Sequence, residues 1–171
     1  MKSNFSFLAE KFPVLYQIGI LTEKYLYSDA NSCLIKLGML GETIVNLMLK
    51  LDGINPPKIE NTHANRIRLL KREGLLPRDI DDILYLLRTT RNDAIHQNFE
   101  DEEKCKTLIE MAYTLSGWFM QTYGDWNFNS STFVLPIDDK TDYDNIIREK
   151  EDVIKELTKK LNEGLEVRLL V

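Results

Sequence analysis

The stretch LLRTTRNDAIH, residues 86–96, ends a segment whose apolar residues recur every three or four positions. This spacing is typical of an amphipathic helix with one buried face. At about 100° per residue, Arg88, Asn92 and His96 form one polar stripe roughly 80° wide, whereas Arg91 lies nearer the apolar side. The stretch therefore predicts a helix that turns one arginine toward the interior of a helical protein.

The same helical spacing extends outward over most of the chain. Residues 29–51 predict a helix that is apolar around much of its circumference, which favours a position at the centre of the bundle. Pro56-Pro57 and Gly74 interrupt the pattern and mark loops. The sequence predicts an all-α fold, an up-down helical bundle with helices over residues 12–26, 29–51, 62–72, 77–96 and 101–124.

The pattern changes after Gly124. Residues 126–137 are rich in aromatic and β-branched side chains, which predicts a short extended arm laid against the bundle. Residues 142–162 predict a charged C-terminal helix, with too few apolar heptad positions for a coiled coil. The chain would thus divide into a bundle over 1–137 and a charged linker helix over 138–171. Its apolar last residues, 165–171, predict that a further domain follows.

Composition places the chain among ordinary globular proteins. Apolar residues make up 43% and charged residues 29% of the 171 residues, which excludes fibrous and low-complexity classes. No uncharged stretch reaches the roughly 18 apolar residues of a membrane helix. Glu10 and Lys11 interrupt the region where a signal peptide needs an apolar run. The sequence predicts a cytoplasmic protein with no membrane segment.

Cysteine and histidine are scarce. The chain contains Cys33, Cys105, His63 and His96, and neither CxxC nor HExxH occurs. We therefore expect no metal site, no disulfide and no cofactor. A Cys105–His96 pair is a conceivable alternative, but a cysteine buried in a helix is the simpler interpretation.

Charge is uneven along the chain. A formal charge of −5 argues against a tight, sequence-independent grip on nucleic acid by the whole surface. Residues 61–99 nevertheless carry seven basic and five acidic side chains. This local excess predicts a basic patch, and the alternative is a solvated helix face without a ligand. The candidates for contact with nucleic-acid phosphates are Arg66, Arg68, Lys71, Arg72 and Arg88.

Glu42 is the natural candidate for a partner of Arg91. It is the sole carboxylate between Asp29 and Asp52, so it interrupts an otherwise apolar helix. An unpaired buried carboxylate is costly, and a bidentate pair with Arg91 would satisfy both groups. We therefore expect Glu42 to be a structural partner of Arg91.

The polar residues near the end of this helix also admit a catalytic interpretation. His96 would act as a general acid or base and Arg91 would stabilise a phosphoryl transition state, with Asn92 and Asp93 orienting them. Such a set could cleave RNA through its 2′-hydroxyl without a metal. The structural alternative is that Arg91 holds the bundle together and His96 interacts with the helix C-terminus. Spacing alone favours the structural alternative.

The run RNDAIH, residues 91–96, resembles the motif of the HEPN superfamily, in which an arginine and a polar residue precede a histidine. That resemblance implies a bundle of HEPN type. In many members two copies form a homodimer in which the two motifs share a cleft that cleaves RNA. It thus implies RNA as a ligand and a homodimer as the assembly.

A longer resemblance covers residues 5–136, which are similar to the N-terminal helical module of the type I restriction endonuclease R (motor) subunit. It implies other restriction-modification subunits as partners, contact with DNA or RNA, and a part in phage defence. Members often carry glycine where this chain has Arg91, so the resemblance does not imply catalysis there. No GxxxxGK[ST] P-loop occurs in the sequence. The runs that carry the resemblance are FSFLA (5–9), ANSCLIKLG (30–38), RIRLLKREG (66–74), RNDAIH (91–96) and WFMQTYGDWNF (118–128).

Three functions therefore stand as hypotheses. The favoured one is a non-motor accessory module of a type I restriction R subunit, for assembly or nucleic-acid contact, because that resemblance covers most of the chain. The second is a stand-alone, metal-independent HEPN endoribonuclease that acts as a homodimer through Arg91 and His96. The third is a scaffold whose polar stripe is purely structural.

Overall fold

Helices dominate the part of the chain that the computed structural model describes, which is residues 2–97, 101–138, 140, 145, 148–149, 151–156 and 158–159. No β-strand occurs in these ranges, so the all-α prediction is confirmed. The last helix of the series, η2, is a short π-helix that continues α5. The order is η1 (Asn4–Leu8), α1 (Pro13–Tyr25), α2 (Ala30–Leu51), α3 (His63–Arg72), α4 (Arg78–Gln97), α5 (Glu102–Phe119) and η2 (Met120–Gly124).

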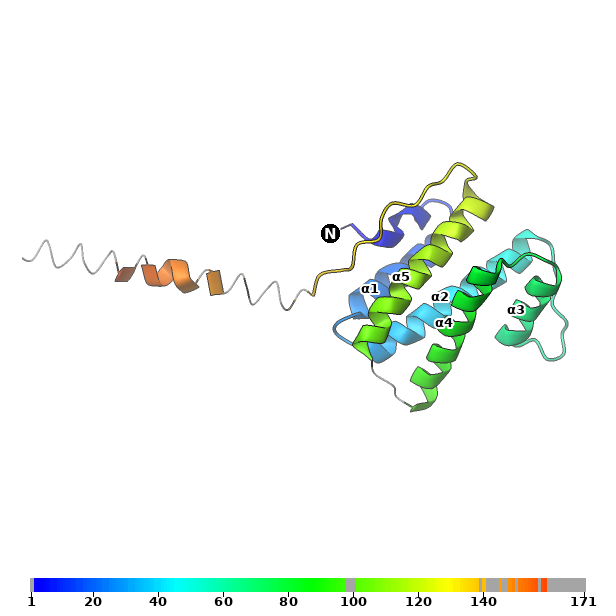
Figure 1. Cartoon of the computed structure of the whole chain (residues 1–171), viewed down its shortest axis with the longest axis horizontal. Coiled ribbons are helices and arrows are strands. Elements are labelled where there is room, and N and C mark those ends of the chain that lie inside the picture. The colour runs from blue at the N-terminus through cyan, green and yellow to red at the C-terminus, as the bar shows by residue number, and fades with distance from the viewer. Residues whose placement is uncertain are drawn as a thin grey trace, which may run out of the picture. The chain divides into compact units, whose positions relative to one another are not determined.

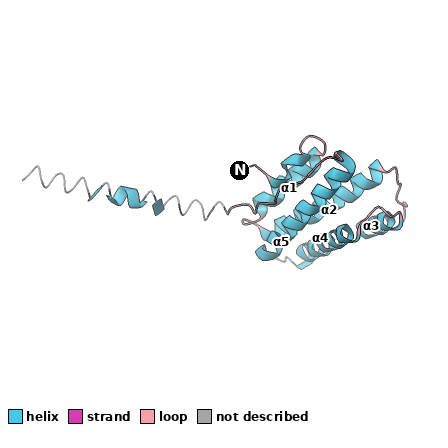
Figure 2. Cartoon of the chain, turned by 45° about the horizontal axis from the view of Figure 1, so that its top comes forward, coloured by secondary structure: helices cyan, strands magenta, loops and turns pink. Residues whose placement is uncertain are grey.

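Helix α2 is the centre of the bundle, because α1, α3, α4 and α5 all pack against it (Figures 1 and 2). Its inner side is fully buried and apolar, which explains why the sequence there is so hydrophobic. Helices α2 and α4 run antiparallel, since Asn31 donates a hydrogen bond to the carbonyl of Ala94 and Gly38 lies beside Arg91. The predicted central position of this helix is confirmed.

Local sequence explains where the helices begin and end. The side chains of Asp29, Thr62 and Asp101 each accept a hydrogen bond from a backbone N–H in the first turn of α2, α3 and α5. Gly53 and Gly74 follow α2 and α3 with φ of 65° and 73°. This left-handed conformation suits glycine and ends a helix.

Helices α2 and α4 approach closely at Gly38, but not as closely at Gly41. A Cβ atom on Gly38 would overlap the Cβ, Cγ and Cδ atoms of Arg91. A Cβ atom on Gly41 would meet Leu87 and Leu84 at 3.4 and 3.5 Å, which is ordinary contact. Gly38 therefore makes the space that the aliphatic part of Arg91 fills.

The middle of the predicted arm, residues 131–134, lies against the bundle. Asn4 holds the backbone of Val134 from both sides, with its Nδ2 donating to the carbonyl at 2.7 Å and its Oδ1 accepting from the N–H at 3.0 Å. The Tyr113 hydroxyl donates to the carbonyl of Ser131 at 2.7 Å. Phe133 packs on Tyr113 with ring centroids 5.5 Å apart. The arm is thus fixed to η1 and α5.

The chain divides into two compact units, residues 1–135 and residues 136–171. In the second unit, residues 151–156 are helical, as expected for the charged helix. Much of the predicted range 142–162, and all of the apolar end 165–171, lies outside the described residues.

Helix α2 is also long and apolar enough, by length and composition alone, to cross a membrane. More than half of that apolar stretch is buried inside the protein. Burial of this kind is what the core helix of a bundle requires, and the packing of four helices around α2 accounts for its composition.

Candidate functional site

Two guanidinium groups converge on the carboxylate of Glu42. Arg66 of α3 donates through Nη2 to Oε1 at 2.7 Å, and Arg91 of α4 donates through Nη1 to Oε2 at 2.6 Å. The three side chains are only 14–29% exposed. Because Glu42 belongs to α2, one carboxylate joins three helices. We call this place, formed by Glu42, His63, Arg66, Arg88 and Arg91, the α2–α3–α4 junction.

The periodicity of α3 turns one of its cations inward. At about 100° per residue, Arg66 lies on the same side as the buried residues Ile67 and Leu70. Arg68 and Arg72 lie on the opposite, exposed side. Arg66 is also held by Asn61, whose backbone carbonyl and side-chain oxygen accept from Nη1 at 3.1 and 3.2 Å. A single helix thus separates a structural cation from a solvated basic face.

His63 lies on the inward side of α3, in the α2–α3–α4 junction. Burial lowers the pKa of His63 from 6.5 to about 4. The carboxylate of Glu42 opposes this shift, while the positive charges of Arg66, Arg88 and Arg91 add to it. The imidazole is therefore neutral at physiological pH. His63 was not among the predicted site residues, although its spacing from Arg66, Ile67 and Leu70 places it on the buried face of a helix.

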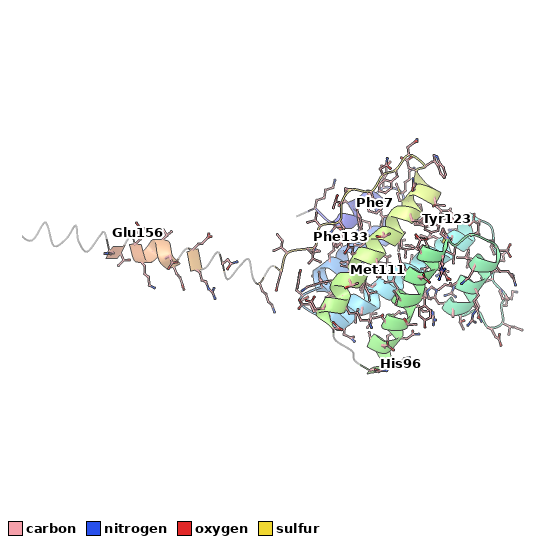
Figure 3. The ribbon with its side chains drawn as sticks, viewed as in Figure 1. Phe7, His96, Met111, Tyr123, Phe133 and Glu156 are labelled. Atoms are coloured by element: carbon pink, nitrogen blue, oxygen red, sulfur yellow. The ribbon has the colours of Figure 1, made fainter. Side chains whose placement is uncertain are left out.

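The predicted catalytic residues do not share one environment. Arg91 is half-buried and bound to Glu42, whereas Asn92 and His96 are exposed. Asp93 is half-buried. Figure 3 shows His96 at the C-terminal end of α4. Five residues of an α-helix rotate the chain by about 140° net and advance it by roughly 7.5 Å, so Arg91 and His96 point to different sides of α4.

The other basic candidates are spread over two helices. Arg68 donates to the side chain of Asn65 at 2.6 Å, Lys71 forms an ion pair with Asp81, and Arg72 lies 3.6 Å from Glu73. The guanidinium carbon of Arg88 lies 5.6 Å from the ring centroid of Tyr85. These pairs lie at exposed or half-exposed positions, where an ion pair contributes little to stability and a competing anion can displace it.

The two cysteines are core residues. Cys33 and Cys105 are both fully buried and both carry free thiols. A hydrogen bond with Cys105 and burial raise the pKa of the Cys33 thiol, so it is a poor nucleophile. Among the residues that the structure describes, no three side chains of His, Cys, Asp or Glu are placed to hold a metal ion.

The chain is similar to a restriction-enzyme subunit and matches a protein family. It is 29% identical over 136 residues to the type I restriction enzyme EcoKI endonuclease subunit of Escherichia coli (strain K12). The matched region covers 79% of this chain and 11% of that protein, so the chain spans about a tenth of its relative. No solved structure matches the chain. Residues 22–163 match the family described as a domain of unknown function (DUF4145), and the chain belongs to that family.

Proposed function

We propose that residues 1–137 form a HEPN-type helical module that serves a type I restriction enzyme as a non-motor accessory. Its task would be assembly with the other restriction-modification subunits or contact with nucleic acid. One observation carries this proposal: the similarity to a type I endonuclease subunit extends over 79% of the chain. The matched region is a small part of that large subunit, as expected for an accessory module.

The geometry of α3 supports a contact role. Arg68, Lys71 and Arg72 lie within one stripe on the exposed side of α3, while Arg66 ties the opposite side to Glu42. Anchoring one side of a helix keeps the charges on its other side in a fixed position, which reduces the entropy cost of binding. An anionic partner, such as the nucleic-acid backbone, suits this stripe.

The alternative, a metal-independent endoribonuclease built from Arg91 and His96 of two copies, is less well supported. It requires both side chains to reach one cleft, and they lie on different sides of α4. Arg91 is also engaged by Glu42 at 2.6 Å. An RNA-cleaving pair would have to break this ion pair first.

The proposal is tested by mixing the purified chain with a purified modification and specificity complex of a type I system, and separately with duplex DNA. Sedimentation velocity reports complex formation in both cases. We expect the chain to bind at least one of these two partners, and we expect the double substitution Arg68→Glu and Arg72→Glu to weaken that binding. Lys24→Glu with Lys50→Glu is the charge-matched control, because both lysines are exposed on other helices.

Two results would contradict the proposal. If the chain binds neither the modification and specificity complex nor duplex DNA, the accessory role is wrong. Incubation with RNA in EDTA covers the alternative, since products that depend on His96 and end in a cyclic phosphate would make the chain a ribonuclease instead.

A further inference from the structure

Buried polar atoms without a hydrogen-bond partner gather at the α2–α3–α4 junction. Four such side-chain atoms occur among the described residues, and three of them are Nδ1 of His63, Nε of Arg66 and Nε of Arg91. Buried polar groups are nearly always paired, because an unmade hydrogen bond is costly. Three polar atoms that lack a hydrogen-bond partner therefore lie close together at this junction.

Charge at the junction points to the sign of that partner. Three guanidinium groups, those of Arg66, Arg88 and Arg91, act on His63, and the carboxylate of Glu42 is the single negative charge that opposes them there. The charges that act on His63 are thus mostly positive, although the guanidinium carbon of Arg88 lies over Tyr85, 5.6 Å from the ring centroid, on the more exposed side. These positive charges would attract and stabilise a bound anion.

The junction reaches the surface along α4. Arg88 and Arg91 are one helical turn apart, and both are half-exposed, with 29% of the Arg91 side chain open to solvent. An incoming anion would meet these two guanidinium groups first. It would reach the covered Nε–H groups of Arg66 and Arg91 only after the side chains around Glu42 had moved apart.

We propose that the α2–α3–α4 junction binds a phosphate group, with Arg88 and Arg91 as its outer contacts and with Glu42, His63 and Arg66 behind them. A phosphate offers several oxygens to two neighbouring guanidinium groups and carries the charge that the junction lacks. Glu42 holds Arg66 and Arg91 in place in this structure and would be the internal competitor of the phosphate. His96 lies outside the site.

This inference deepens the nucleic-acid contact of the proposed function, and the two histidines of the chain allow a direct test. The imidazole NMR signals of His63 and His96 are followed while inorganic phosphate is added to the whole chain at constant pH and ionic strength. The variants His63→Gln and His96→Gln assign the signals. We expect a saturable shift of the His63 signals and none of the His96 signals.

A second titration uses a short single-stranded DNA in place of inorganic phosphate. If both ligands shift the His63 signals and compete, the phosphate comes from a nucleic-acid backbone. If inorganic phosphate alone does so, the site takes a free phosphate. No shift of His63 with either ligand, or parallel unsaturable shifts of both histidines, overturns the proposal. Loss of assembly with restriction-modification subunits would instead contradict the proposed function and leave this result standing.

A matched pair of variants separates the site from general surface charge. Arg88→Gln removes one outer contact and should weaken phosphate binding roughly tenfold, as loss of one charge-assisted hydrogen bond does. Arg78→Gln makes the same charge change at an exposed position at the start of α4 and should leave affinity unchanged. Equal losses in the two variants would assign the binding to net charge and sink the proposal.

Discussion

The α2–α3–α4 junction and the C-terminal end of α4 each carry one of the two histidines, and they differ in almost every physical respect. His63 is largely buried, faces three guanidinium groups and one carboxylate, and has a pKa lowered to about 4. His96 is exposed at the end of a helix. Arg91 belongs to the first region although His96 is nearer in sequence. Helix packing, and not sequence distance, therefore decides which polar groups share an environment.

Removal of Glu42 is expected to disturb the junction most. Glu42→Ala would leave Arg66 and Arg91 half-buried without their shared partner and should lower the free energy of unfolding by about 3 kcal/mol. Urea unfolding measures the loss. Glu110→Ala, at an exposed position of α5, is the control and should change stability by about 0.5 kcal/mol at most. A loss for Glu42→Ala no larger than the control would show that the ion pairs are unimportant.

The close approach of α2 to Arg91 predicts a slightly smaller effect. Gly38→Ala places a methyl group where the Arg91 side chain lies, so α2 and α4 must separate or Arg91 must leave Glu42. Such overpacking should cost about 2 kcal/mol. Gly41→Ala, three residues along the same helix, meets Leu87 at ordinary contact distance and should be nearly neutral. Equal thermal stability of the two variants would contradict this difference between the glycines.

The two histidines should differ in how stability depends on pH. Folding lowers the pKa of His63 from 6.5 to about 4, so the unfolded chain binds this proton more readily than the folded chain. The stability of the α3 region is fully present above pH 6.5 and is lost as the pH falls toward 4. The loss should reach about 1–2 kcal/mol, after allowance for partial exposure.

Hydrogen exchange of the α3 amides at pH 7 and pH 5, corrected for intrinsic rates, measures this effect. His63→Gln should flatten the dependence, and His96→Gln should leave it as in the unmodified chain. If both variants keep the full dependence, another group is responsible for it.

The smallest effect is expected at the end of α4. His96→Ala removes an exposed side chain and should change the free energy of unfolding by no more than about 0.5 kcal/mol. Thermal unfolding, monitored by circular dichroism, measures this change in stability. A loss above 1 kcal/mol would show that His96 has a structural partner and would weaken the contrast with His63.

The sequence predicted the bundle well because apolar spacing and capping residues act locally. The central position of α2 followed from its apolar circumference, and a Glu42–Arg91 contact followed from the cost of an unpaired buried carboxylate. The contact is not the predicted bidentate pair, because Glu42 offers Oε2 to Arg91 and Oε1 to Arg66. The local excess of basic residues predicted Arg66 as a phosphate contact, whereas the structure turns it inward to share Glu42.

His63 was harder to find, because its environment is made by three helices. Its neighbours Arg88 and Arg91 are about 25–28 residues away in sequence, and no local pattern encodes that they face α3. The helical periodicity of α3 places His63 on the same face as Ile67 and Leu70. This identifies a buried histidine but not its charged surroundings. Tertiary packing supplies the rest.

The central claim is that one carboxylate joins Arg66 and Arg91, and a double-mutant cycle tests it most directly. Urea unfolding is measured for Arg66→Ala, Arg91→Ala and the double variant, with Arg68→Ala replacing Arg66→Ala in a control cycle. We expect the Arg66/Arg91 double variant to lose about 1 kcal/mol more stability than the sum of the single losses, because each arginine still holds Glu42 when the other is gone. Additivity within about 0.3 kcal/mol, equal to that of the control cycle, would contradict it.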